Sequence, residues 1–268
     1  MAGDCAAERC ENSVKSVTAH MIHKPTHRQI RAIIQTVEQW RKAIAAERLP
    51  FPKPNPYEAT LFMQTEVGEA VDALMRRYSR TAYTRANSNP KRARLYDELL
   101  DVAFMAASIV GERQPTSGQI SFALSTAFQA NPLPESIREA ATFRQLLGEP
   151  RIQEHQLRYL LTTRLTHFTA QACAEAEELH WVDRGLAFKH EAAIRVRPVT
   201  EHLIFLATCA IIVAYAAAAL HLSQTVLMDS YDTARPDWFV EDLQYRLDER
   251  REKVIKRAAI IANSNRLQ

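Results

Sequence analysis

Long stretches of this sequence place apolar residues at helical spacing, and almost no glycine interrupts them. Between residues 27 and 46 the apolar positions recur every three or four residues, at Ile30, Ile33, Ile34, Val37 and Trp40. One buried helix face requires this spacing, whereas a strand would alternate apolar and polar residues. The 268 residues include only 6 glycines, and the periodic segments lack the regular turns that strands need. The sequence therefore predicts an all-α fold.

The same periodicity and its interruptions divide the chain into modules. Beyond the first helix, further helices are predicted at about 57–78, 90–110, 151–162, 164–182, 198–225 and 237–262. Four prolines between residues 49 and 56 favour an extended connection before the second helix. We expect a mobile tail over residues 1–24, a helical module over 25–112, a helical connector over 113–149 and a second helical module over 150–268.

The second module repeats the plan of the first in a degenerate form. Aligning 97–110 with 200–213, and Phe62 with Phe168, sets these residues against one another: Glu66 and Ala172, Glu69 and Glu175, Glu98 and Glu201, Asp101 and Ile204. Half of the acids of the first module therefore have an acidic counterpart. We predict a helical bundle in which a four-helix module is followed by a degenerate copy, as an internal pseudo-dimer.

Charge and cysteine content exclude several classes of protein. The formal net charge of +3 is too small to imply nucleic-acid binding. The four cysteines form no CxxC pair and no spacing with histidine that suits zinc, which argues against a disulfide framework or a zinc site. Residues 1–20 lack the apolar core of a signal peptide. We expect a cytoplasmic protein.

One segment could belong to a membrane or to a protein core. Leu203–Leu220 holds 18 residues without a charge, the lower edge of a spanning length. Seven of them are alanine, and the charged segment that follows offers no second span. The segment is also the aligned counterpart of the helix at 90–110. These features favour a buried helix in a bundle over a membrane helix.

Two acidic pairs are the candidate chemical site. Glu66 and Glu69 lie at i and i+3 on one predicted helix, and Glu98 and Asp101 do so on the next, so each pair shares one helix face. If the four carboxylates converge, each contact at about 4 Å costs on the order of 4 kcal/mol at an effective dielectric near 20. A cation between them would remove this cost. Oxygen ligands without histidine or cysteine indicate Mg²⁺, with Mn²⁺ as a substitute.

The alternative interpretation of such pairs is a solvated helix face bonded to lysine or arginine, as expected for residues 248–257. Two matched pairs on consecutive apolar helices are more specific than one. Between the two pairs, residues 76–94 contain seven arginines and lysines and no acid. We select Arg77, Arg80, Lys91 and Arg94 as candidate phosphate ligands. Basic residues of this kind also complement a helix C-terminus, so both roles remain open.

At these residues the chain resembles the MazG-type, all-α NTP pyrophosphohydrolases, a superfamily that includes dCTP pyrophosphatases and dimeric dUTPases. The shared pattern is ExxE on one helix and ExxD on the next, here Glu66-Val-Gly-Glu69 and Glu98-Leu-Leu-Asp101. The resemblance covers about residues 27–112. It implies that the four acids bind Mg²⁺ and catalyse the hydrolysis of a nucleoside triphosphate to the monophosphate and pyrophosphate. Which carboxylate activates the water is left open.

The resemblance also implies a base pocket and a pairing of modules. Similar proteins build the pocket from the first helix and the segment before ExxE, which points to Trp40, Phe51, Lys53 and Tyr57. Family modules form active sites within dimers, so an internal pseudo-dimer or a homodimer is expected. A nucleotide-binding sensor or scaffold without catalytic activity is the alternative function. The preferred base and sugar are not indicated.

Overall fold

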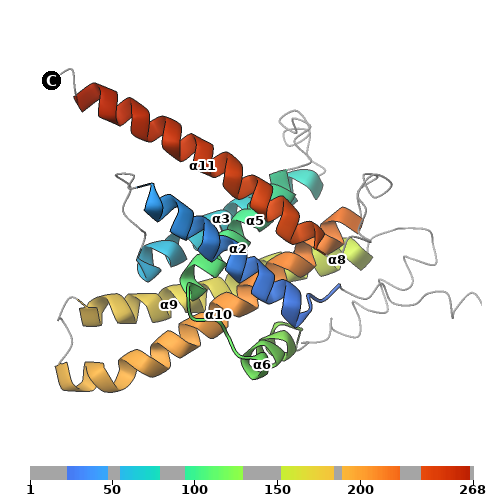
Figure 1. Ribbon diagram of the computed structural model, residues 1–268. Helices are drawn as coiled ribbons and strands as arrows, with labels where there is room; N and C mark the ends of the chain where they lie inside the picture. Colours follow the sequence, from blue (N-terminus) through green and yellow to red (C-terminus); the bar gives the residue numbers. More distant parts are fainter. Residues whose placement is uncertain are drawn as a thin grey trace, which may run out of the picture.

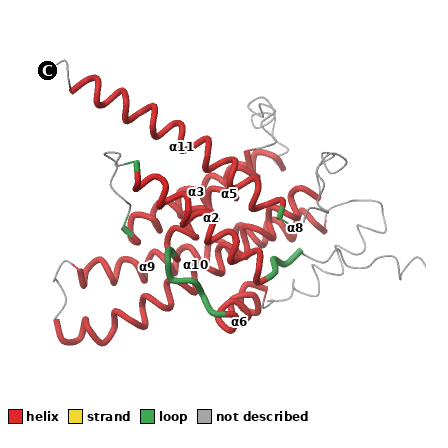
Figure 2. Tube along the Cα trace, in the orientation of Figure 1, coloured by secondary structure: helices red, strands yellow, loops and turns green. Residues whose placement is uncertain are grey.

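The structure is a computed structural model that describes residues 23–47, 55–78, 94–128, 152–183, 189–223 and 237–265. Throughout these segments every regular element is a helix, which confirms the all-α prediction (Figures 1 and 2). The elements are α2 (His27–Ala46), α3 (Pro56–Tyr78), α5 (Arg94–Val110), α6 (Ser117–Phe128), α8 (Ile152–Tyr159), the π-helical segment η1 (Leu160–Leu165), α9 (Thr166–Asp183), α10 (Lys189–Ser223) and α11 (Trp238–Asn265).

Local sequence signals fix where several helices begin and end. Thr26 and Gln29 form a capping box at the start of α2, and Thr116 and Gln119 form the equivalent bonds before α6. Before α3 the Asn55 side chain accepts a hydrogen bond from the backbone N–H of Glu58 at 2.8 Å. The helix α5 ends at Val110, and the next residue, Gly111, has a φ of 58°, in the left-handed region that glycine adopts without strain.

The centre of the bundle is formed by α3, α5, α9 and α10. The helix α3 packs against α5 and α9, and α10 packs against the same two helices. The helices α3 and α5 thus each contact the helix aligned with them in the second module, α9 and α10 respectively. This pairing is compatible with an internal pseudo-dimer, and the degenerate repeat itself stays a prediction.

The helix α10 contains a long apolar segment. Its segment Val199–Leu222 is long and apolar enough to cross a membrane, yet 89% of the apolar window is buried inside the protein. The burial follows from its position between α5, α9 and α6. Its length and composition would allow it to span a membrane, and in this structure it packs as a core helix of the bundle.

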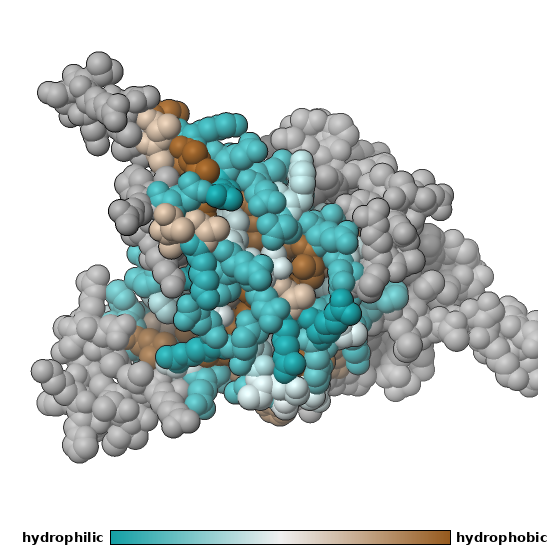
Figure 3. All heavy atoms as spheres, in the orientation of Figure 1, coloured by the Kyte–Doolittle hydropathy of each residue, from teal (hydrophilic) through white to brown (hydrophobic). Residues whose placement is uncertain are grey.

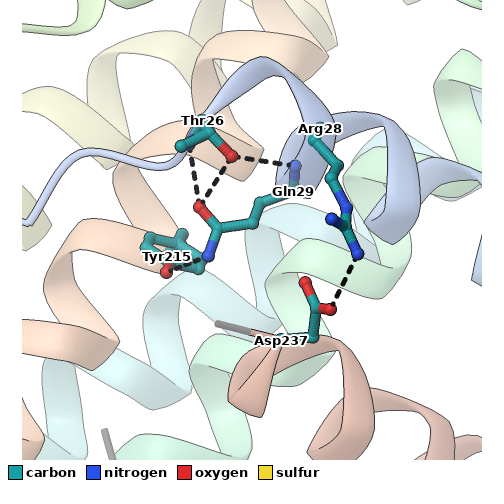
Figure 4. A network of polar contacts seen from close by, with 5 residues as sticks. All are labelled: Thr26, Arg28, Gln29, Tyr215 and Asp237. Atoms are coloured by element: carbon teal, nitrogen blue, oxygen red, sulfur yellow. Dashed lines mark hydrogen bonds and ion pairs between the residues drawn. The ribbon is translucent and has the colours of Figure 1, made fainter. Parts of the chain in front are cut away.

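The helices α2 and α11 cover one side of this bundle. The first turn of α2 is joined to α10 by a 3.0 Å hydrogen bond from Gln29 to the Tyr215 hydroxyl. A 3.3 Å ion pair joins Arg28 to Asp237, the residue that precedes α11 (Figure 4). The face shown in Figure 3 is mainly hydrophilic. The apolar sides of the two helices are therefore turned towards the core, where Ile30 and Leu247 are fully buried.

Two predicted boundaries are wrong. Instead of separate helices at 151–162 and 164–182, the chain is helical without a break from Ile152 to Asp183, with η1 in the middle. Arg164 within η1 donates hydrogen bonds to the carbonyls of Thr126 and Ala127, near the end of α6. The helix α10 begins at Lys189 rather than at 198, so that Pro198 lies inside it. A proline inside a helix removes one backbone hydrogen bond but does not have to end the helix.

Candidate functional site

Three of the four predicted carboxylates meet between α3 and α5. Glu66 and Glu69 on α3 and Glu98 on α5 each offer a carboxylate oxygen, and these oxygens all lie within 4.8 Å of one another. Glu98 is buried with 6% exposure, Glu66 is half-buried and Glu69 is exposed. The helical i, i+3 spacing puts Glu66 and Glu69 on one face, and the packing of α3 on α5 brings Glu98 to that face.

The pKa of Glu66 is affected by burial and by the neighbouring acids. Burial, and after it the negative charges of Asp101, Glu98 and Glu69, raise the pKa of the Glu66 carboxyl from 4.5 to about 7. Arg250 acts in the opposite direction and lowers this pKa. The site therefore disfavours a further negative charge on Glu66 and would be stabilised by an added cation.

Asp101 lies one helical turn after Glu98 and is bound by two arginines of α11. The Arg246 guanidinium donates to both carboxylate oxygens, at 3.3 Å from Nε and 3.1 Å from Nη2, and Arg250 Nη2 lies 2.6 Å from Oδ2. The Asp101 side chain is only 5% exposed. Asp101 thus stands outside the group of three carboxylates, although its charge still raises the pKa of Glu66.

The two arginines also influence the neighbouring groups. Burial raises the pKa of the Asp97 carboxyl, and Arg246 opposes this rise. The hydrogen bonds to Asp101 raise the pKa of the Arg246 guanidinium above its ordinary value. The guanidinium of Arg250 lies 5.0 Å from the centre of the Phe104 ring, in a cation–π contact. The side of α11 that faces α5 therefore supplies the positive charge beside the acids.

Sequence analysis did not single out Arg246 and Arg250. A signal was nevertheless present, because each arginine follows by three residues a leucine of the buried stripe of α11, Leu243 and Leu247. Residues at that spacing border the apolar stripe instead of the solvated face. Charged residues at the edge of a buried stripe indicate an acidic partner on a neighbouring helix.

Of the residues predicted to contact a base, Trp40 and Tyr57 are described. The Trp40 indole donates a 2.7 Å hydrogen bond to the Leu247 carbonyl and meets the Phe104 ring edge-on at 5.2 Å. Tyr57 stacks on His180 with ring centres 4.7 Å apart. The structure gives both aromatic rings a packing partner within the protein, and their contact with a base stays a prediction.

The side chains of all four predicted phosphate ligands, Arg77, Arg80, Lys91 and Arg94, lie outside the described part of the chain. The predicted base contacts Phe51 and Lys53 lie outside it too. The Arg76 side chain is described, and its guanidinium forms a 2.6 Å ion pair with Asp72 one turn earlier on α3. The described cations nearest the acids are accordingly those of α11.

The donor set suits a hard divalent cation. Three carboxylates from two helices provide oxygen ligands of the kind that Mg²⁺ and Mn²⁺ bind, and the group within 4.8 Å includes no histidine or cysteine. Burial and the neighbouring acids both raise the pKa of Glu66, and a bound cation would favour its charged form. The residues that would hold the ion are Glu66, Glu69 and Glu98, with Asp101 adjacent and bound to arginine.

Comparison of the chain with protein-family models, with curated proteins and with solved structures gave no match, so the site is interpreted from its own geometry and chemistry.

Proposed function

We propose that this protein is a divalent-metal-dependent nucleoside triphosphate pyrophosphohydrolase, which converts a nucleoside triphosphate and water to the monophosphate and pyrophosphate. The observation that carries the proposal is the convergence of Glu66, Glu69 and Glu98 within 4.8 Å at the junction of α3 and α5. The raised pKa of Glu66 supports it, because burial and the neighbouring acids disfavour its charged form and a cation would favour that form.

The proposed roles follow from the position of each group. Glu66, Glu69 and Glu98 would hold Mg²⁺, which polarises phosphoryl oxygens and lowers the pKa of a bound water. Water would attack the α-phosphorus, the bond from that phosphorus to the α–β bridging oxygen would break, and pyrophosphate would leave with the bridging oxygen. One carboxylate of the group would orient the water and accept its proton. Asp101 would bind the metal ion as well if Arg246 and Arg250 released its carboxylate.

Hydrolysis is tested with a panel of the common ribo- and deoxyribonucleoside triphosphates in the presence of Mg²⁺, with products separated by chromatography. The expected result is equimolar monophosphate and pyrophosphate from at least one substrate, and none in EDTA. The panel also identifies the preferred base and sugar. Absence of turnover with every substrate, under both Mg²⁺ and Mn²⁺, would refute the proposed activity.

The arginines on Asp101 favour a second candidate function, a nucleotide-binding sensor without catalytic activity. A carboxylate that stays bound to Arg246 and Arg250 is not available to a metal ion, which would leave three carboxylates to bind it. Calorimetry that shows binding of a magnesium nucleotide, together with no product after hours of incubation, would select this function over hydrolysis.

A further inference from the structure

The outer face of α3 carries an exposed stripe of residues. Leu61, Gly68 and Met75 follow one another at intervals of seven residues, close to two helical turns, so they lie on one line along the helix. Thr65 and Asp72 lie on the same face. All five residues are exposed, Leu61 by 43% and Met75 by 53%, and we call them the α3 stripe. Large apolar side chains that line up on one exposed helix face indicate contact with another molecule.

Gly68, in the middle of the α3 stripe, has no explanation within the described chain. Glycine destabilises the interior of a helix relative to alanine, because it loses more backbone freedom on folding. The helical backbone of α3 does not require a glycine here, and a Cβ at Gly68 would meet no atom of the described chain within 4 Å. A missing side chain does, however, allow a second helix to approach closely, since side-chain size sets the distance between packed helices.

The α3 stripe is complementary to itself when two copies run antiparallel. A twofold axis at Gly68 sets the two glycines against each other. It also places Leu61 of one copy against Met75 of the second, because both residues are seven positions from the glycine. Thr65 comes beside Asp72 of the second copy, where its hydroxyl can donate to the carboxylate. The symmetry forms each of these contacts twice.

The charges beside the stripe fit the same arrangement. Glu58 and Arg76 are eighteen residues apart, which is five turns of the helix, so they lie on one side of α3. In the antiparallel pair Glu58 of one copy comes beside Arg76 of the second. The Arg76 side chain is 50% exposed, so it can reach beyond its partner Asp72. Glu69 would approach its own copy on that side, but it is exposed, so solvent screens this repulsion.

We propose that the α3 stripe is an interaction surface for a second copy of this chain, in which two α3 helices cross antiparallel at Gly68. The partner is a second copy because the stripe matches itself in side-chain size and in charge. One pair of crossing helices buries less surface than a standard protein–protein interface, so the dimer has micromolar rather than nanomolar affinity. The inference goes beyond the proposed hydrolysis and does not depend on it.

Sedimentation velocity over a dilution series tests for the dimer, and two substitutions test its register. Leu61→Lys and Met75→Glu should each weaken dimerisation by about tenfold or more, because each sets a charge against an apolar side chain twice in the dimer. An equimolar mixture of the two variants should dimerise again. The introduced lysine and glutamate then face each other in one contact, and the native Met75 and Leu61 do so in the other.

The matched control for these variants is Tyr245→Lys on α11, where the side chain is 68% exposed and far from the stripe in sequence, and it should dimerise like the wild type. A wild-type protein that stays monomeric at the highest concentration would overturn the proposal and leave the stripe to a different partner. A mixture that stays as monomeric as its two components would overturn the antiparallel register.

Gly68→Gln should change two measurements in opposite directions. Glutamine is a better helix former and has open space in the single chain, so the melting temperature of dilute protein should rise by about 2 °C. Its side chain would separate the crossing helices, so dimerisation should weaken by about tenfold or more. Unchanged dimerisation, or a lower melting temperature, would contradict a crossing at Gly68. Neither measurement requires nucleotide turnover, so this proposal and the proposed function can fail separately.

Discussion

The helix pairs α3/α5 and α9/α10 pack against each other in one bundle, but their acidic residues are arranged differently. In the first pair, Glu66, Glu69 and Glu98 converge, and the pKa of Glu66 rises to about 7. In the second pair, the position aligned with Glu66 is the fully buried Ala172. Glu175, aligned with Glu69, accepts a 2.7 Å contact from His202. Among the described residues, such a group of converging acids is found in the first helix pair, and this is where we place the proposed function.

The largest expected effect separates Glu69 from its counterpart. Glu69→Gln should lower nucleotide hydrolysis by about a hundredfold or more, because it removes a metal ligand while keeping the size of the side chain. Glu175→Gln should leave the rate within about twofold, because Glu175 has His202 as its partner. Steady-state assays with Mg²⁺ measure both. Equal losses in the two variants would contradict a functional difference between the helix pairs.

A second prediction asks whether the acid missing from α9 can be restored. Ala172→Glu should lower the free energy of unfolding by about 3 kcal/mol or more, because Ala172 is fully buried and the new carboxylate would have no solvent. Denaturant titration measures the loss. The matched control is Ala170→Glu at an exposed position of the same helix, which should change stability by less than about 0.5 kcal/mol. Similar stabilities of the two variants would show that α9 accommodates an acid as α3 does.

A third prediction concerns the pH dependence that Glu66 confers without metal. Its folded-state pKa of about 7 exceeds its ordinary value of 4.5, so the folded protein binds more protons than the unfolded chain between these values. Stability should therefore fall as pH rises through that window. Glu66→Gln should be more stable than wild type at pH 8, by on the order of 1 kcal/mol after allowance for solvent screening, and nearly equal to it at pH 4.5.

Thermal unfolding in EDTA at the two pH values measures this difference. Asp72→Asn is the control, because Asp72 lies on the same helix with a side chain that is 51% exposed. If the stability of Glu66→Gln relative to wild type did not depend on pH, the raised pKa of Glu66 in the folded protein would be contradicted.

The smallest expected effect lies in the second helix pair. His202→Ala removes the partner of Glu175, whose contact lies at the surface, with the His202 side chain 47% exposed. The free energy of unfolding should fall by less than about 1 kcal/mol, and hydrolysis should not change. Thermal unfolding and the same nucleotide assay test this. A large loss of activity would place His202 in the site and overturn the contrast between the helix pairs.

The sequence predicted the parts of the fold that depend on short-range order. The predicted helices at 27–46 and 57–78 agree with α2 and α3 to within one residue, and the predicted end at residue 110 agrees with α5. Thr26 and Asn55 cap the starts of α2 and α3, and Gly111 follows the end of α5. The predicted boundaries failed near residue 163, where a π-helical segment continues the helix, and at Lys189, where α10 begins before its proline. In both places tertiary packing sustains a helix that the local sequence alone would interrupt.

The candidate site divides in the same way. That Glu66 and Glu69 share a face, and that Glu98 and Asp101 share another, follows from the helical repeat and needs no tertiary information. The choice of partner for each acid was decided by the packing of α11 on α5, which brings Arg246 to Asp101 across 145 residues of sequence. Helix periodicity acts over a few residues, whereas a contact between distant helices depends on how the whole core is filled.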